Sequence, residues 1–365
     1  TLFPYTTLFR SEAIMKNTRI KFLALTLAVS ILMTVVTGCA TNKSSQEKKD
    51  KSLVIYTNSG SDGRAEWLTE QAALKGFKVS IVTLGAGDLT NRLVAEKNNQ
   101  IADLVFGLNA VEYEKLKKQK LLMKYKPFWA KEVDMSLGDK EGYYYPIVTQ
   151  PLLLAYNNKS YNKQTVPMDW TEIVKKEYKN KYTILNLGGG TSKTILASIL
   201  VRYKDTNGQY GISKEGWEVV KNYIQNGHIE VTGEDVYAAA ISGERPMVMT
   251  YGSGLLQNEK KRGVNFGIMK PKVGVPFVVE QVAIFNNSKK TDVAKEFVDW
   301  FGSAEVQAEW SVKFGSVPVQ PAALAKSSPE VKELMANVKP QKIDWTFVAN
   351  NIDKWMEKVQ LEFVK

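Results

Sequence analysis

The sequence predicts an α/β fold for the chain from about residue 52 onward, and three observations support this prediction. Short apolar runs typical of strands alternate with segments of helical periodicity. The runs end in turn residues, and glycine and hydroxyl residues gather where a run gives way to a helix. Alternation of this kind is expected for a largely parallel sheet covered by helices.

Each element follows from its local pattern. Strands are predicted where β-branched and apolar residues run up to a turn, at 53–60, 77–85, 101–109, 182–190 and 246–252. Helices are predicted where apolar residues recur at helical spacing, at 63–75, from Asp88 onward, and at 111–122, 191–204, 216–227, 234–244, 291–303, 328–338 and 345–363.

The first part of the chain carries a targeting pattern. A basic head at 16–21 precedes the apolar run 22–36, which is shorter than the roughly 20 residues that a spanning helix needs. Val36-Thr37-Gly38-Cys39 resembles a lipobox, the site at which bacterial lipoprotein precursors are lipidated and cleaved. We therefore expect a signal peptide at 15–38, lipidation of Cys39, and an exported protein lipid-anchored to the cell membrane, on the extracellular face or in the periplasm. A short membrane anchor that remains attached is the alternative.

The segments on either side of this pattern lie outside the part of the chain for which we predict a fold. Residues 1–14 resemble the translation of a common sequencing-adapter oligonucleotide, so we interpret them as an artefact. Residues 39–51 are polar and charged, as in a flexible tether.

The formal net charge of the chain is +11, but lysines alternate with glutamates and form no basic stripe with interleaved aromatics. This pattern argues against a nucleic-acid partner and suits a surface near anionic lipid.

Four junctions between a strand and a helix are candidates for binding an anion. They lie at 58–61, 85–88, 188–192 and 251–254; all contain glycine, and those at 58–61, 188–192 and 251–254 also contain serine or threonine hydroxyls. Ligands of α/β sheets bind at the carboxyl ends of strands, where backbone N–H groups and helix N-termini are available.

Three segments resemble the type 2 substrate-binding proteins of ABC importers, in particular the cluster named for iron(III), thiamine and phosphonate ligands. They are LVIYTNSG (53–60), GDLTNRLVAEKNNQIADLVFGLNA (87–110) and VEQVAIFNNSKKTDVAKEFVDWFGSAEVQ (279–307). The resemblance implies an α/β fold of two lobes joined by two crossing strands, with a ligand cleft between the lobes. We place lobe one at 52–150 and 283–365, lobe two at 151–282, and the crossing strands at 149–157 and 278–286.

The resemblance also implies a function in transport. The protein would capture a small solute outside the cytoplasmic membrane and deliver it to an ABC permease and its ATPase. Ferric binders of this family often use two adjacent tyrosines in lobe two, whereas the matching position here has Tyr251 followed by Gly252. A small organic anion (a phosphonate or phosphate ester) or thiamine or its phosphate therefore fits better, the cationic ring of thiamine stacking on a tyrosine. Ferric iron held by Tyr251 is the alternative.

The expected ligand-binding residues come from the junctions, the tyrosines near them and the second crossing strand. They are Tyr56, Ser59, Gly60, Ser61, Gly87, Asp88, Tyr145, Gly190, Thr191, Ser192, Tyr251, Ser253 and Glu280. We expect a monomer without a cofactor, and a metal site only if the ligand is iron.

An exported enzyme is a remote alternative. The segment 188–194 lacks the spacing of a phosphate-binding P-loop, and the sequence has neither G-x-S-x-G nor H-E-x-x-H. An adhesion or scaffold lipoprotein is a third class, which would not need the glycine-hydroxyl junctions. We therefore expect a binding protein without catalytic residues.

Overall fold

The computed structural model describes residues 50–364 and contains eleven strands and twelve α-helices in this range. The strands are β1 Ser52–Thr57, β2 Lys78–Thr83, β3 Leu104–Phe106, β4 Tyr145–Asn157, β5 Tyr182–Ile184, β6 Lys204–Gln209, β7 His228–Ile229, β8 Met247–Tyr251, β9 Phe266–Ile268, β10 Phe277–Ile284 and β11 Val317–Pro318. The helices are α1 Arg64–Leu74, α2 Ala86–Ala95, α3 Ala110–Lys118, α4 Gly190–Leu200, α5 Lys214–Asn226, α6 Val236–Ser242, α7 Gly252–Arg262, α8 Thr291–Phe301, α9 Ala304–Phe314, α10 Pro321–Ala325, α11 Pro329–Asn337 and α12 Trp345–Lys358.

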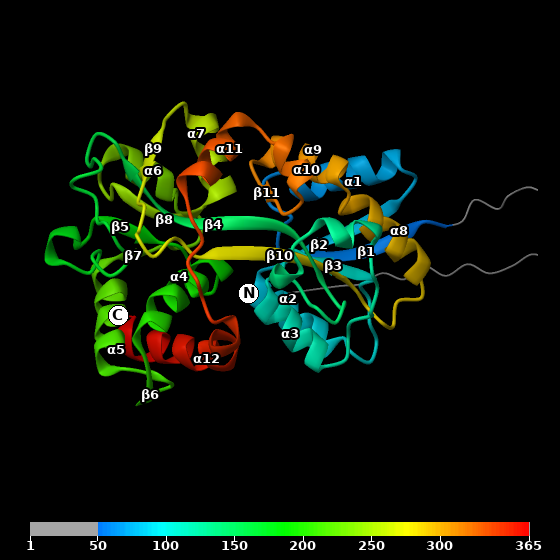
Figure 1. Ribbon diagram of the computed structural model, residues 1–365, viewed down its shortest axis with the longest axis horizontal. Coiled ribbons are helices and arrows are strands. Elements are labelled where there is room, and N and C mark those ends of the chain that lie inside the picture. The colour runs from blue at the N-terminus through cyan, green and yellow to red at the C-terminus, as the bar shows by residue number, and fades with distance from the viewer. Residues whose placement is uncertain (1–49, 365) are drawn as a thin grey trace, which may run out of the picture. The chain divides into compact units, whose positions relative to one another are not determined.

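A mixed sheet runs through this part of the chain in the order β2-β1-β3-β10-β4-β8-β5-β7, with β9 and β11 also pairing with β4 (Figure 1). The ladders β1–β2, β1–β3, β5–β7 and β5–β8 are parallel. Every ladder that involves β4 or β10 is antiparallel. The prediction of a largely parallel sheet was therefore wrong for the centre of the sheet, although the α/β class is correct.

The two longest strands connect two lobes. β4 and β10 pair along their length, from Pro151 opposite Phe277 to Tyr145 opposite Val282, with a register shift at Glu280/Gln281. The first half of β4 and the end of β10 lie among the strands of lobe one, whereas the second half of β4 pairs with β8 and β9. This arrangement confirms the predicted two-lobe fold with two crossing strands.

Each lobe has its own apolar core, and we define the lobes by these cores. In lobe one, α8 and α9 cover one face of the sheet and bury aromatic residues such as Phe297 and Trp310. The other face of lobe one is covered by α2 and α3, with Leu93 and Leu116 buried. In lobe two, α4, α5 and α7 pack with β4, β5 and β8 in one large cluster. The helices therefore fix the positions of the strand ends that face the other lobe.

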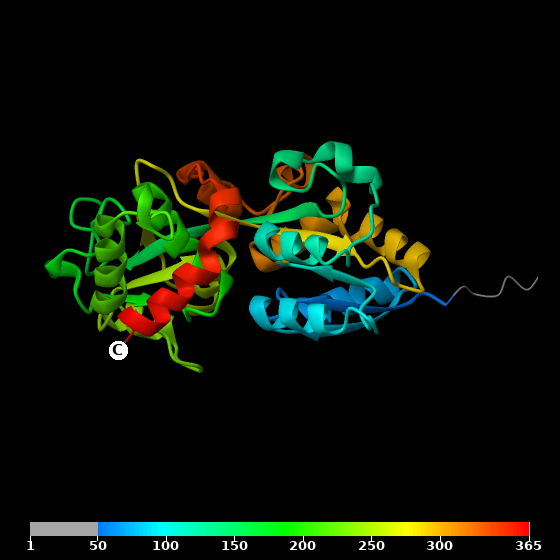
Figure 2. The same cartoon turned by 90° about the horizontal axis from the view of Figure 1, so that it is seen from below.

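The C-terminal helix belongs to lobe two. Val348, Ile352 and Trp355 of α12, together with Phe363, lie in the same buried cluster as α4 and α5. Figure 2 shows this helix, in red, beside the green helices of lobe two. The sequence placed all of 283–365 in lobe one, and this packing corrects that assignment for the C-terminal segment. An amphipathic pattern identifies the face that a helix buries but not the core that receives it.

The N-terminal predictions lie outside the described residues. They concern the artefact at 1–14, the signal peptide at 15–38, the lipidation of Cys39 and most of the tether. Within 50–364, none of the helices has the length and apolar character needed to span a bilayer.

Candidate functional site

The four predicted junctions all lie between a strand and a helix. Residues 58–61 follow β1, 85–88 connect β2 to α2, 188–192 connect β5 to α4, and 251–254 connect β8 to α7. Two of these junctions belong to lobe one and two to lobe two. The strands that precede them end toward the opposite lobe, as expected at the carboxyl ends of a sheet.

A side-chain contact between the lobes identifies the centre of the candidate site. Arg64, the first residue of α1, is 6% exposed, and its Nη2 donates to Ser253 Oγ at 3.3 Å. Ser253 lies in the first turn of α7 and is fully buried. Its backbone N–H donates to Gln150 Oε1 on β4 at 3.1 Å. Lobe one, lobe two and a crossing strand therefore meet at this point.

The turn before α1 holds the guanidinium of Arg64 in place. Asp62 and Gly63 both have left-handed backbone conformations, with φ of 57° and 79°. Arg64 Nη1 donates to Ser61 O at 3.2 Å and to Asp62 Oδ2 at 3.0 Å, and its guanidinium lies 5.1 Å from the Phe314 ring centroid. A positive charge at a helix N-terminus is unfavourable because it lies at the positive end of the helix dipole. The contacts with Ser61, Asp62 and Phe314 therefore stabilise the Arg64 guanidinium at a position that α1 alone disfavours. Such local conflict is typical of functional positions.

Glu280 brings a carboxyl group from β10 to the same region. Its Oε2 accepts a hydrogen bond from Ser59 Oγ at 2.8 Å. Burial raises the pKa of Glu280 above the ordinary carboxyl value, while Ser59, the charge of Arg64 and the side chain of Gln150 act in the opposite direction. Its carboxyl group is therefore easier to protonate than an exposed glutamate and can both accept and donate hydrogen bonds.

Tyr251 is the last residue of β8 and precedes the first turn of α7. Burial raises the pKa of its phenol, and the charge of nearby Arg64 partly offsets this effect. A Cβ atom on Gly254 would lie only 2.9 Å from the Tyr251 ring, so the helix needs a glycine there for the ring to take this position. The phenol is thus a hydrogen-bonding group within range of the charge of Arg64.

The second and third junctions also approach each other from the two lobes. A Cβ atom on Gly87, in the first turn of α2, would lie 3.9 Å from Lys193 Nζ, in the first turn of α4. The loop before α4 is ordered by Asn186, whose backbone N–H donates to Glu230 Oε2 at 3.0 Å. The amide oxygen of Asn186 accepts from the N–H of Gly188 at 2.9 Å. A second cation therefore lies between two helix N-termini.

The structure brings together four of the predicted site residues, namely Ser59, Tyr251, Ser253 and Glu280. Gly60 and Ser61 belong to the same turn as Ser59, and Gly87 lies next to Lys193. Asp88, Gly190 and Thr191 lie in the first turns of α2 and α4. Ser192 is buried, and its hydroxyl donates to Leu185 O at 2.6 Å, so this hydroxyl is occupied within lobe two.

Two predicted tyrosines do not join this group. Tyr56 is buried, its hydroxyl donates to Glu96 Oε1 at 3.1 Å, and Arg92 lies 4.7 Å from its ring centroid. Tyr145 is buried in lobe one, with its ring centroid 5.9 Å from that of Trp129. Both rings are packed inside lobe one, so neither is available to stack on a ligand between the lobes.

Three residues that were not predicted lie at these junctions: Arg64 and Gln150 contact Ser253, and Lys193 lies beside Gly87 at the other pair of junctions. Arg64 had a detectable signal, because an arginine directly after Asp-Gly at a helix start opposes the helix dipole. Gln150 and Lys193 had none, since a polar residue in a strand and a lysine in a helix are common on ordinary surfaces.

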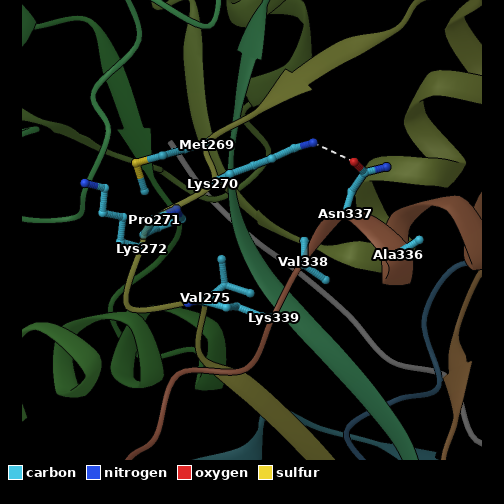
Figure 3. Close-up of a pocket in the computed structure, with 10 residues that line it drawn as sticks. Met269, Lys270, Pro271, Lys272, Val275, Ala336, Asn337, Val338 and Lys339 are labelled. Atoms are coloured by element: carbon cyan, nitrogen blue, oxygen red, sulfur yellow. Dashed lines mark hydrogen bonds between the residues drawn. The ribbon is translucent and has the colours of Figure 1, made fainter.

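The described region also contains cavities. One of about 470 Å³ lies between the lobes, lined by residues of 109–118 and 136–144 in lobe one, by Thr194 and the start of α12 in lobe two, and by 277–279 of β10. Residues 50–364 contain no group of three or more His, Cys, Asp or Glu side chains able to hold a metal ion. A cavity of about 330 Å³ in lobe two lies between the 269–275 segment and the end of α11 (Figure 3). Lys270 Nζ donates there to Asn337 Oδ1 at 2.5 Å. None of the site residues named above lines this cavity.

Comparison with known proteins defines the class to which this chain belongs. Residues 67–339 match the family model described as bacterial extracellular solute-binding protein. Because the match spans more than half of the chain, this protein belongs to that family of solute-binding proteins, which is not a family of enzymes.

Individual relatives agree with this assignment. The chain is 34% identical over 310 residues to the "Probable ABC transporter periplasmic-binding protein y4fP" of Sinorhizobium fredii, covering 85% of this chain and 86% of the relative. The structure is similar to a ferric binding protein from Campylobacter jejuni, with a TM-score of 0.72, 23% identity, and coverage of 84% of this chain and 97% of that one. It is also similar to AfuA from Actinobacillus pleuropneumoniae with fructose-6-phosphate bound, with a TM-score of 0.69, 20% identity, and coverage of 85% and 99%. These two structural similarities show the fold.

Proposed function

We propose that this protein is the substrate-binding component of an ABC importer and that it captures a small organic anion between its lobes. A phosphate ester or a phosphonate has the required chemistry. The observation that carries the proposal is the buried guanidinium of Arg64, which contacts Ser253 at the N-terminus of α7 in the opposite lobe. The name of the relative in Sinorhizobium fredii supports the transport role.

The charges and dipoles around Arg64 favour an anion. Arg64, which also pairs with Asp62, supplies a cation at Ser253, and Lys193 supplies another beside Gly87. The N-termini of α4 and α7 supply backbone N–H groups and the positive ends of helix dipoles. A guanidinium binds phosphate and carboxylate oxygens in a fixed planar geometry. Glu280 would donate a hydrogen bond when protonated, and Ser59 supplies a hydroxyl beside it. Together these groups suit a ligand with an anionic head and a hydroxylated body.

Ferric iron is the second candidate, favoured by the names of several structurally similar proteins and by the position of Tyr251. Iron(III) prefers several oxygen ligands, including phenolates. Within the group of site residues described here, Tyr251 is the only tyrosine and Arg64 lies near it. Thiamine or its phosphate would have only Tyr251 to stack on, since Tyr56 and Tyr145 are packed in lobe one.

One preparation of the full chain distinguishes these ligands. Mass spectrometry of small molecules released from the purified protein should show a stoichiometric organic anion, and metal analysis of the same sample should show little iron. Stoichiometric iron with a visible charge-transfer colour would show that the ligand is iron and not an organic anion. The proposed role in transport would still hold. A protein that carries no ligand and binds no phosphate ester, phosphonate or iron would contradict the binding role itself.

Lipid anchoring at Cys39 is part of the same proposal, because a tethered binding protein stays near its permease. Cys39→Ala should remain uncut or move to the soluble fraction. A mature, membrane-bound Cys39→Ala protein would show that the anchor lies elsewhere.

A further inference from the structure

Helix α8 lies at the end of lobe one where the described chain begins. Lys51 forms an ion pair with Glu296 of α8, one residue before β1 starts. One turn further along α8, Asp299 Oδ1 accepts from the Phe128 N–H at 3.0 Å. The segment that follows Pro127 and the start of the folded chain are therefore fixed to the same helix. Figure 1 shows α8 beside the beginning of β1.

Two large apolar side chains are exposed at this end of lobe one. Phe128 is 64% exposed although its backbone is fixed to α8. Leu74, the last residue of α1, is 77% exposed, and Phe77 just after it packs on Phe297 and Trp300 of α8 with centroid distances of 5.4 and 5.8 Å. An isolated exposed apolar residue is common. Phe128 is bonded to α8 through its backbone, and Leu74 lies three residues before Phe77, which packs on the same helix. Both therefore belong to the end of lobe one where β1 begins, which marks a surface that can enter an interface.

At this end of lobe one, lysine side chains outnumber acidic side chains. Five acidic side chains here are engaged: Asp50 pairs with Lys290, Asp292 with Lys295, Glu296 with Lys51 and Glu132 with Lys131, while Asp299 accepts from Tyr125 and Phe128. Glu70, one turn before Leu74 on α1, is exposed and has no ion-pair partner among residues 50–364. The exposed lysines Lys75, Lys78, Lys126 and Lys289 have no acidic partner within ion-pair distance among residues 50–364. These lysines give the surface a net attraction for a negatively charged partner.

The surface lies at the opposite end of the strands from the ligand site. β1 and β2 begin here, at Ser52 paired with Lys78, and they end at the junctions that face lobe two. The chain before residue 50 joins at this end, and in the sequence it carries a basic head, an apolar run and the candidate lipidation site Cys39. A partner bound at this surface would leave the cleft residues uncovered.

We propose that this basal face, formed by Leu74, Lys75, Lys78, Lys126, Phe128 and Lys289, contacts the anionic surface of a lipid bilayer. The lysines provide attraction to acidic headgroups, and the Phe128 and Leu74 side chains enter the boundary between headgroups and acyl chains. A contact of this kind orients lobe one relative to the bilayer, in addition to any lipid anchor at Cys39. The inference does not depend on the identity of the transported ligand.

A fluorophore placed on the face tests the contact in the full chain. Cys39 is the only cysteine in the sequence, so Cys39→Ser removes both the lipidation site and competing labelling. In this background, Phe128→Cys carries an environment-sensitive nitrobenzoxadiazole label. Val231→Cys serves as the matched control, because Val231 is 62% exposed and lies in lobe two. Both are mixed with vesicles of equal parts phosphatidylglycerol and phosphatidylcholine, and with vesicles of phosphatidylcholine alone.

The expected result is a blue shift and a severalfold rise in emission at position 128 on the anionic vesicles, with no change at 231. Lys126→Glu combined with Lys289→Glu should reduce the 128 signal by ~5-fold or more, because each lysine near an anionic surface contributes separately. Lys163→Glu combined with Lys179→Glu, which changes two exposed lysines of lobe two, should leave it unchanged. No shift at 128 on anionic vesicles, an equal shift at 231, or a 128 signal indifferent to the Lys126 and Lys289 charges would each overturn the proposal.

Discussion

Arg64 Nη2 lies 3.3 Å from Ser253 Oγ and so joins the first residue of α1 in lobe one to the first turn of α7 in lobe two. A second bond between the lobes runs from Gln257 Nε2 to Phe314 O at 2.7 Å. Both bonds need the lobes to be close together, so opening of the cleft would break them. Ligand contacts that exist only when the lobes are close would shift the population toward this arrangement.

Replacing Arg64 should weaken anion binding more than it weakens the fold. Arg64→Gln removes a charged donor worth about 1.5–3 kcal/mol, which corresponds to a ~10–150-fold loss of affinity. Arg64→Lys should recover only part of this loss, because an ammonium cannot reproduce the planar donor geometry. Calorimetric titration with the anion released from the wild-type protein measures the effect. Arg202→Gln, which breaks a surface pair with Asp169 in lobe two, is the matched control. Equal affinities for Arg64→Gln and wild type would place the anion elsewhere.

Tyr251→Phe separates an organic anion from iron. If the phenol donates one hydrogen bond to an organic ligand, the substitution costs about 1–3 kcal/mol and the protein is colourless before and after. If the phenol is a ferric ligand, the wild-type protein is coloured and the variant loses both colour and binding. Absorption spectra and titrations on the two proteins give the answer. A coloured wild-type protein with stoichiometric iron would contradict the organic-anion proposal.

Glu280 should make stability depend on pH in a specific direction. Burial raises its pKa in the folded state, so between the ordinary carboxyl pKa and this raised value the folded protein binds more protons than the unfolded chain. The free energy of unfolding contributed by this group therefore falls as the pH rises through that window and is fully regained below it. Glu280→Gln should raise Tm at neutral pH and flatten this dependence.

Thermal unfolding across the acidic to neutral range measures this effect. Glu70→Gln, at an exposed position of α1, is the control and should follow the wild-type curve. A Glu280→Gln protein that loses stability at neutral pH would mean that the carboxylate is needed in its charged form.

Much of the framework could be predicted from local sequence, because it depends on short-range rules. Glycine and hydroxyl residues directly after apolar runs located the junctions at 58–61 and 251–254, where the structure has the N-terminal turns that frame the site. Parallel and antiparallel strands can have the same pattern of apolar residues, so the sequence did not predict the antiparallel pairing of β4 and β10.

The site itself depends on long-range packing, which the sequence does not state. From the sequence, Tyr56 near the end of β1 could face either the cleft or a helix. The structure shows that Arg92 of α2 lies over its ring and that Glu96 accepts a hydrogen bond from its hydroxyl. Arg64 depends on a partner that lies far along the chain, at Ser253. The same limit applies to α12, whose apolar face is evident while the lobe that it joins is not.

The placement of α12 can be tested through Trp355. This side chain is fully buried, its indole N–H donates to Tyr210 O at 3.0 Å, and its ring centroid lies 5.5 Å from that of Phe347. Trp355→Ala should lower the free energy of unfolding by about 3–5 kcal/mol, as for other large cavities in apolar cores. Trp345→Ala, at the start of the same helix and 37% exposed, should cost less than about 1 kcal/mol. Hydrogen exchange then identifies the lobe. Loss of protection in α4 and α5 with β1 and β2 unchanged agrees with packing in lobe two, whereas loss confined to β1 and β2 would return the C-terminal helix to lobe one.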